Sequence, residues 1–202
     1  MKLLIFDTET TGLPVKKLPA EKEPDNWPHI VSISWVVLDS LPNEILSQQN
    51  FIIKPLDWHV PAESTAIHGI SHDLAQKTGQ PLSLVIEKFM SEEYDVLVAH
   101  NIDFDMNVLI NAIKWDLKIS VPLFPQQICT MKLSKNICRL SGRFGYKYPK
   151  LKELYFHAFG EYPFEAKLHN SMYDVLVLTK IVQKFGPLRK LMNLREAVIL
   201  NK

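Results

Sequence analysis

The chain has 202 residues, of which 47% are hydrophobic and 22% are charged. This size and composition allow one full buried core, which is most simply a single domain. The net charge of +1 excludes a global electrostatic attraction to nucleic acid, so binding of that kind would depend on local basic patches or on metal ions.

The cysteine content and the hydropathy pattern predict a compartment. The chain has two cysteines, Cys129 and Cys138, and we find no signal-peptide pattern. We therefore expect a reduced, intracellular protein of the cytoplasm. No apolar stretch reaches the length needed to cross a bilayer, so we expect no membrane association.

The first dozen residues carry the first chemical signal. Leu3 to Phe6 form an apolar run typical of a strand buried on both faces, and Asp7 and Glu9 follow it. Side chains alternate along a strand, so the two acids point to the same side. Paired carboxylates at a buried strand end repel each other and lose hydration, a cost that a bound cation usually offsets. The alternative is an acidic strand end that merely meets solvent.

The first half of the chain predicts an antiparallel meander followed by helical pieces. Residues 14–28 are rich in proline and mixed charge, which indicates a mobile surface loop beside the acidic pair. Strands are expected over 29–39 and 48–54, with the turn between them at 41–44. Ser71 is expected to cap a helix, and a longer helix is expected over 81–90.

The second half alternates between strands and helices. A buried strand over 95–99 is expected to run directly into a helix with Met106 and Leu109 on its core face. A short strand over 127–129 precedes a helix over 131–136, which Thr130 is expected to cap. Further helices are expected over 150–159, 170–185 and 188–200, the last of them basic and amphipathic. This order predicts an α/β fold, with a mixed sheet flanked by helices.

The loop over 139–150 mixes four basic residues with three aromatic ones. That composition suits contacts with nucleic-acid backbone and bases, although it is equally typical of a solvated loop. The sequence alone leaves both interpretations open.

Two further acidic candidates complete a constellation. Asp105 follows the strand over 95–99, and Asp174 lies on the apolar face of its helix, because Leu178 and Ile181 follow it at helical spacing. An acid on such a face is costly unless it is ligated or paired. His169 precedes this helix and can reach the same space.

Three motifs in this order resemble one family. They are FDTETTGL, HNIDFDMNVL and HNSMYD, and they resemble the motifs of the DnaQ-like (DEDDh) 3′–5′ exonucleases. Ala66-Ile-His-Gly-Ile70 and Trp27-Pro28 are also similar to that family. The resemblance covers about residues 1–185 and implies a ribonuclease H-like mixed sheet of five strands, the first three antiparallel.

The resemblance also implies roles. The metal ligands would be Asp7, Glu9, Asp105 and Asp174, binding two Mg²⁺ or Mn²⁺ ions, and His169 would be the general base. The pocket for the terminal nucleotide would be lined by Thr10, Thr11, Gly12, Leu13, His68, Asn101 and Phe104. His68 also fits an ordinary turn histidine, as does His100, and Phe104 also fits a core side chain.

The implied activity is hydrolysis of terminal phosphodiester bonds at the 3′ end of single-stranded DNA or of frayed ends, which releases nucleoside 5′-monophosphates. The same chemistry on RNA is the first alternative, because recognition of a 2′-OH depends on pocket details. A non-catalytic nucleic-acid-binding or polymerase-associated module is the second. The candidate protein partner is a DNA polymerase or a repair protein. We expect residues 1–185 to form the exonuclease domain and residues 186–202 a C-terminal amphipathic helix packed on it or on a partner.

Overall fold

The structure is a computed structural model that describes residues 1–164 and 168–194. One five-stranded sheet, in the order β3-β2-β1-β4-β5, forms its centre. Its strands are β1 (Lys2–Thr10), β2 (Ile30–Asp39), β3 (Glu44–Ile52), β4 (Val96–Ala99) and β5 (Gln126–Cys129). The first three strands are antiparallel, whereas β4 runs parallel to β1 and to β5. The predicted ribonuclease H-like mixed sheet is therefore confirmed.

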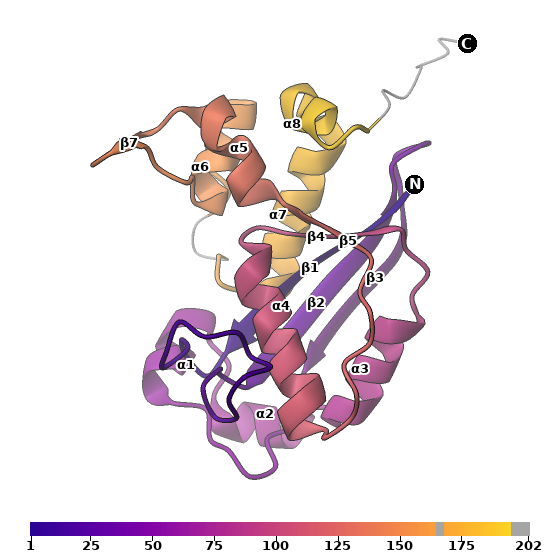
Figure 1. Cartoon of the computed structure of the whole chain (residues 1–202), viewed down its shortest axis with the longest axis vertical. Coiled ribbons are helices and arrows are strands. Elements are labelled where there is room, and N and C mark those ends of the chain that lie inside the picture. The colour runs from indigo at the N-terminus through magenta and orange to yellow at the C-terminus, as the bar shows by residue number, and fades with distance from the viewer. Residues whose placement is uncertain (165–167, 195–202) are drawn as a thin grey trace.

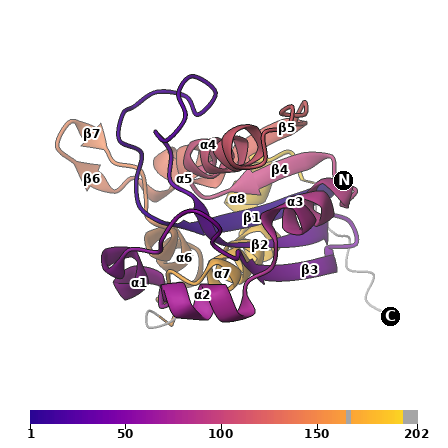
Figure 2. The ribbon, with the colours of Figure 1, turned by 90° about the horizontal axis from the view of Figure 1, so that it is seen from below.

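Helices cover both faces of this sheet (Figures 1 and 2). The helices are α1 (Ala62–His68), α2 (His72–Thr78), α3 (Leu82–Ser91), α4 (Ile102–Asn111), the π-helical turn η1 (Ala112–Asp116), α5 (Thr130–Cys138), α6 (Leu151–Phe159), α7 (Ser171–Lys184) and α8 (Gly186–Leu191). One core lies between the sheet and α3, α4 and η1, and a second core lies between the opposite face and α6, α7 and α8. None of the helices found in residues 1–164 and 168–194 is long and apolar enough to span a bilayer.

The alternation of side chains along β1 assigns its residues to these two cores. Leu4 and Phe6 belong to the core beneath α3 and α4, and Leu3 and Ile5 belong to the core beneath α7. Burying a side chain of this size contributes about 1.5–3 kcal/mol, so the pattern fixes the register of the strand. Continued along β1, the alternation directs Asp7 and Glu9 to the α7 side and Thr8 to the α4 side.

Several element boundaries differ from the sequence-based expectation. Strand β3 begins at Glu44 rather than at residue 48, because the exposed residues after the turn already pair with β2. Thr130 does not cap a helix: α5 begins at Thr130 itself, and its hydroxyl donates to the carbonyl oxygen of Ala99. The loop over 139–150 contains a small hairpin of two paired strands, β6 (Ser141–Gly142) and β7 (Gly145–Tyr146).

The loop over 14–28 is held in place rather than free. The backbone N–H of Ala20 donates to Asn107 on α4, and the indole N–H of Trp115 donates to the Ala20 carbonyl oxygen. Within the loop, the Asn26 side chain accepts from the Lys16 N–H and donates to two carbonyl oxygens. These bonds place the loop against α4 and η1.

The helix expected over 188–200 is shorter in the structure. Helix α8 ends at Leu191, and Met192 and Leu194 after it are buried in the second core. The buried Arg189 guanidinium donates to the carbonyl oxygens of Val182 and Ser40 and to the Asn43 side chain. Residues 195–202, the rest of the expected C-terminal helix, lie outside the described residues.

Candidate active site

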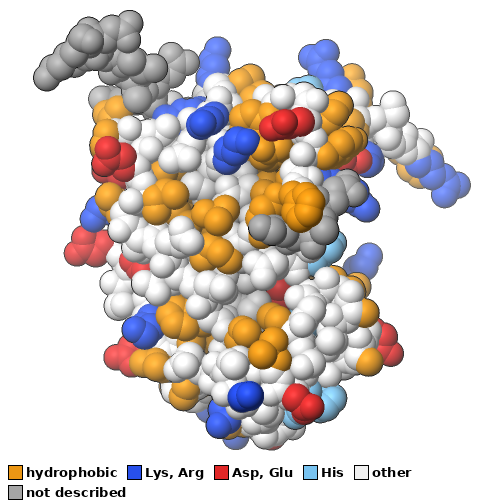
Figure 3. Space-filling view, turned by 180° about the vertical axis from the view of Figure 1, so that it is seen from behind, with side chains coloured by type: hydrophobic (Ala, Val, Ile, Leu, Met, Phe, Trp, Pro, Cys, Tyr) orange, Lys and Arg blue, Asp and Glu red, His pale blue; other side chains and the backbone are white. Residues whose placement is uncertain are grey.

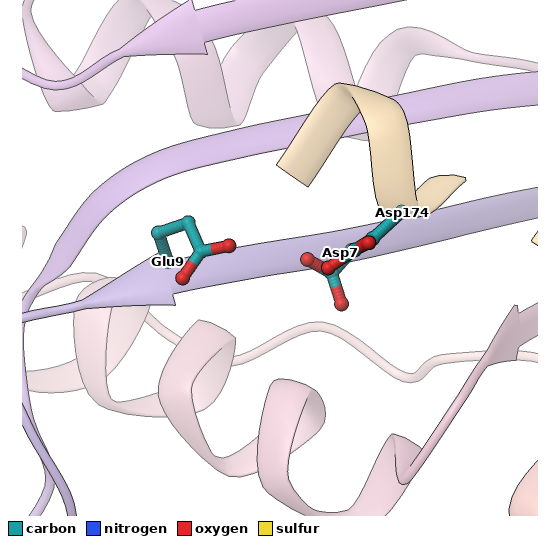
Figure 4. A group of neighbouring side chains, drawn as sticks. All are labelled: Asp7, Glu9 and Asp174. Carbon is teal, nitrogen blue, oxygen red and sulfur yellow. The ribbon is translucent and has the colours of Figure 1, made fainter. Parts of the chain in front are cut away.

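Three carboxylates from distant parts of the chain meet at the end of β1. One oxygen from each of Asp7, Glu9 and Asp174 lies within 4.8 Å of the others. Figure 4 shows Asp7 and Glu9 on the same face of β1, with Asp174 reaching them from the first turn of α7. The sequence pattern predicted this side of β1 for both acids and the inward face of α7 for Asp174, and the structure brings all three together.

The first turn of α7 fixes Asp174. Asn170 caps the helix, and its side-chain oxygen accepts from the N–H of Tyr173 at 3.1 Å. The backbone N–H of His169 donates to Asp174 Oδ2, also at 3.1 Å. The other oxygen, Oδ1, is buried and has no hydrogen-bond partner. A buried carboxylate oxygen without a partner is costly, so this atom is available to a ligand.

Asp105 approaches the group from the α4 side. It is 3% exposed, and its Oδ1 accepts from both the N–H and the hydroxyl of Thr8, at 3.1 and 2.8 Å. Pairing of β4 with β1 ends at Ile5, so the Thr8 N–H has no partner in that strand. The Asp105 carboxylate replaces the missing strand partner at this point. Asp105 is consequently not among the three carboxylates that lie within 4.8 Å of one another, where the sequence predicted four.

Burial disfavours the charged forms of all four acids, and repulsion from neighbouring carboxylates adds to it at Asp7 and Glu9. Burial and the charges of Asp105, Glu9 and Asp174 raise the pKa of Asp7 well above its usual value. Burial, then Asp174 and Asp105, raise the pKa of Glu9 to about 8. Burial also raises the pKa of Asp105 to about 7 and that of Asp174 to about 6, although the bonds from Thr8 and His169 act in the opposite direction.

This donor set fits a hard divalent cation. Every side chain in the cluster is a carboxylate, and Mg²⁺ and Mn²⁺ prefer oxygen ligands. A cation among these groups would favour their charged forms, which burial and the repulsion at Asp7 and Glu9 disfavour, and would supply a partner for Asp174 Oδ1. Asp7, Glu9 and Asp174 are the residues placed to hold it, with Asp105 beside them.

His169 lines two pockets, one of which is also lined by Asp174. The first, of about 490 Å³, is lined by residues of α1 and of the α7 entry, including His68, Asn170 and Tyr173. The second, of about 430 Å³, is lined by Lys150, Leu151, Lys152, Leu168 and Asp174 together with His169. The His169 side chain is exposed and its backbone has a φ of +64°. Such a conformation is uncommon for residues other than glycine and often occurs at functional sites.

The turn after β1 has the form that the sequence indicated. The Thr10 hydroxyl donates to the Gly12 carbonyl oxygen at 2.7 Å, and Thr11 and His29 exchange two hydrogen bonds. A Cβ at Gly12 would meet no atom within 4 Å, so the space over this backbone is open. Leu13 is 80% exposed. The open backbone and the exposed Leu13 side chain are accessible to a substrate.

His68 is more than a turn residue. It is 8% exposed, its Nδ1 accepts from the Ile70 N–H at 3.1 Å, and its Nε2 has no partner. Burial lowers the pKa of His68, an effect that the Thr10 backbone partly offsets. The neutral ring therefore carries its proton on the buried Nε2, next to the Thr10 backbone.

The remaining predicted pocket residues lie on the other side of β1. Asn101 precedes α4 in a left-handed conformation, with a φ of +85°. The Phe104 ring lies 5.7 Å from that of Trp27 and packs against the first core, so its core interpretation is correct for at least part of the side chain. His100 is structural: Nε2 lies 3.0 Å from the Pro149 carbonyl oxygen, and burial lowers its pKa to about 4.

Sequence reasoning missed three contributors to the site. Thr8 holds Asp105, Tyr173 lines the first pocket, and Lys150 lines the second. Thr8 and Tyr173 lie inside the first and third motifs, so their position in the sequence was a signal that their residue type alone did not provide. Lys150 ends the basic and aromatic loop, and only the fold shows that this loop ends at the acidic cluster.

Comparison with protein families identifies the chain. The exonuclease family RNase_T matches residues 4–182. The chain belongs to this family. The exonuclease is of the DnaQ-like type and acts from the 3′ end. Members of the family depend on divalent metal ions, in agreement with the acidic cluster. No curated protein matches the chain.

Solved structures support the same fold. Exonuclease X in complex with 5′ overhanging duplex DNA is 23% identical, with a TM-score of 0.56, and the match covers 92% of this exonuclease and 99% of that chain. The nuclease domain of 3′hExo bound to rAMP is 17% identical, with a TM-score of 0.66 and coverage of 96% and 94%. Escherichia coli Exonuclease I with a dA16 oligonucleotide is 16% identical, with a TM-score of 0.65 and coverage of 95% and 43%. The chain thus spans less than half the length of Exonuclease I.

Proposed function

We propose that the exonuclease removes nucleotides one at a time from the 3′ end of single-stranded DNA or of frayed ends, using two Mg²⁺ or Mn²⁺ ions. The observation that carries this proposal is the convergence of Asp7, Glu9 and Asp174 at the end of β1, with the buried Asp105 beside them. All four have raised pKa values, so they form a site that favours a compensating positive charge.

The acidic side chains and His169 have different roles in the proposed reaction. Asp7, Glu9, Asp105 and Asp174 hold the cations, which when bound activate a water and stabilise the leaving 3′ oxygen. His169 accepts a proton from the attacking water, because its exposed imidazole lies at the junction of the two pockets. The hydrogen bond from the His169 N–H to Asp174 Oδ2 holds the backbone of His169 beside the carboxylates.

The pocket of about 490 Å³ beside His169 suits the terminal nucleotide. Its volume is in the usual range for a small-molecule site. His68 lines this pocket, and the open turn at Thr10, Thr11 and Gly12 offers hydroxyl and backbone groups on the neighbouring side. Asn101 and Phe104 lie across β1 from this pocket and complete the proposed nucleotide contacts.

The choice between DNA and RNA is tested by digestion of matched strands. Single-stranded DNA and RNA of the same sequence are labelled separately at the 5′ and 3′ ends, and the products are resolved over time. The proposal expects a 5′-labelled DNA ladder that shortens by single nucleotides and a 3′ label released at once as a mononucleotide. Faster digestion of RNA would instead identify RNA as the substrate. The rAMP bound to 3′hExo is a precedent for that alternative. Loss of the 5′ label first would contradict the polarity.

Removal of metal tests the role of the acidic cluster. Activity is expected to vanish in excess chelator and to return with Mg²⁺ or Mn²⁺, because the clustered carboxylates need positive charge. Ca²⁺ is expected to bind without supporting efficient turnover, since its larger and looser coordination misplaces the water. Full activity in excess chelator would contradict the metal mechanism.

A further inference from the structure

The hairpin formed by β6 and β7 has no part in the chemistry proposed above. Figures 1 and 2 show it projecting from the body on the same side as α1. Figure 3 shows the projection from behind, with hydrophobic and basic side chains along it. Phe144, between its two strands, is 90% exposed. An exposed aromatic side chain at this position contributes nothing to either core.

The segment carries an uncompensated positive charge. Residues 139–150 include Arg139, Arg143, Lys147 and Lys150 and no acidic residue, although basic and acidic residues are balanced over the whole chain, 23 against 22. Lys147 forms an ion pair with Glu153. Arg139, Arg143 and Lys150 form no ion pair within residues 1–164 and 168–194. Clustered basic groups of this kind attract the phosphates of a polynucleotide.

Aromatic rings alternate with these charges. Besides Phe144, the side chains of Tyr146 and Tyr148 are about half exposed. The Arg143 guanidinium lies 5.2 Å from the Phe144 ring centre, and the Lys135 ammonium lies 5.1 Å from that of Tyr148. Basic groups beside exposed aromatic faces are the combination that single-stranded nucleic acid binds, since bases stack on the rings while cations follow the backbone.

The base of the hairpin is fixed to the active site. The Lys147 N–H donates to the Leu140 carbonyl oxygen at 2.9 Å, which closes the hairpin. The half-buried His100 ties Pro149 to the end of β4 and the start of α5. Lys150 then lines the pocket of about 430 Å³ that it shares with His169 and Asp174. A strand that leaves the reaction centre through this pocket therefore meets Lys150 first and the rest of the hairpin after it.

We propose that the β6–β7 hairpin binds the single-stranded part of the substrate upstream of the scissile phosphate, with a base stacked on Phe144 and phosphates on Arg139, Arg143 and Lys150. The inference rests on the proposed function and adds a second contact to it. Phe144 lies within about 22 Å of Lys150 by chain length. A stacked strand advances about 3.4 Å per nucleotide, so roughly six nucleotides reach the tip.

The test compares long and minimal substrates with a double variant, Arg143→Ala with Phe144→Ala. Binding of a fluorescent single strand of about 12 nucleotides is measured by anisotropy in Ca²⁺, independently of turnover. Hydrolysis is measured with the same strand and with the p-nitrophenyl ester of thymidine 5′-monophosphate, which can fill only the terminal site. Leu84→Ala with Lys88→Ala is the matched control, because it removes one exposed apolar and one exposed basic side chain from α3.

The hairpin variant is expected to weaken binding of the long strand by about 5- to 150-fold, the range for loss of one stacked base. Its turnover of the small ester is expected to equal that of the wild type, and the control pair is expected to change neither. Arg143→Ala alone should reduce the slope of log affinity against log salt by about 0.7. Unchanged binding of the long strand overturns the proposal, as does equal loss on the small ester. Failure of the wild type to hydrolyse either substrate, with intact strand binding, instead counts against the proposed function.

Discussion

Asp103 and Asp105 are two positions apart on α4 and have opposite surroundings. Asp105 is buried and accepts two hydrogen bonds from Thr8, whereas Asp103 is exposed and forms an ion pair with Lys132. Asp105→Ala is expected to abolish turnover with the fold intact. Asp103→Ala is expected to retain most activity and to cost no more than about 1 kcal/mol, because exposed ion pairs contribute little. Metal-dependent digestion and urea unfolding of both variants test this, and the reverse pattern of activity would contradict it.

His169 is expected to act through its side chain, while its backbone holds Asp174. His169→Ala keeps the N–H that donates to Asp174 Oδ2, so the carboxylate cluster should remain able to bind metal. Turnover is expected to fall by about 10²–10⁴-fold, the usual contribution of a general base. The acidic limb of the pH–rate profile should also change, because only an unprotonated imidazole accepts a proton. The matched control is His157→Ala, which removes an exposed histidine from α6. A His169→Ala enzyme with wild-type turnover would remove this residue from the mechanism.

At the scale of the element, the first turn of α7 both stabilises its helix and positions Asp174 and His169. Asn170 caps α7 in the same way that Ser71 caps α2, since each side chain accepts one backbone N–H at 3.1 Å. Loss of either cap is expected to cost about 0.5–2 kcal/mol. Only Asn170→Ala is expected to lower turnover as well, because Asp174 and His169 belong to the turn that it fixes. Chemical unfolding and digestion of Asn170→Ala and Ser71→Ala measure the two effects, and equal losses of activity would contradict the prediction.

The sequence predicted those parts of the site that depend on local periodicity. The alternation along β1 placed Asp7 and Glu9 together, helical spacing placed Asp174 inward, and the Ser71 cap is present as expected. The withdrawal of Asp105 onto Thr8 was not predictable, because it follows from where β4 stops pairing with β1. The role of Thr130 was missed for a similar reason, since its hydroxyl bonds to Ala99 of a neighbouring strand. Local patterns do not report contacts between elements.

At the scale of the whole molecule, the acidic cluster opposes folding when metal is absent. The folded-state pKa of Glu9 is about 8 and that of Asp105 about 7, against ordinary values of 4.5 and 3.8. The folded state therefore holds more protons than the unfolded chain between these limits, and the free energy of unfolding falls as pH rises. His100 works in the opposite direction below its ordinary value of 6.5, because burial lowers its pKa to about 4. Above pH 6.5, His100 no longer changes its protonation, whereas Glu9 and Asp105 still lose protons in the folded state. The change of stability with pH in that range is therefore due to the carboxylates.

The metal-free exonuclease is accordingly expected to lose thermal stability between about pH 6.5 and pH 8. Mg²⁺ or Mn²⁺ should raise the Tm, and the gain should be larger at pH 8, because metal binding relieves a repulsion that protonation relieves at lower pH. Glu9→Gln tests the cause, since it removes one charge and keeps the shape of the side chain. In chelator at pH 8 its Tm should exceed that of the wild type, whereas with metal its advantage should disappear. A wild-type Tm that stays constant over this range in chelator would show that burial and repulsion do not raise the pKa values of Glu9 and Asp105 in the folded state.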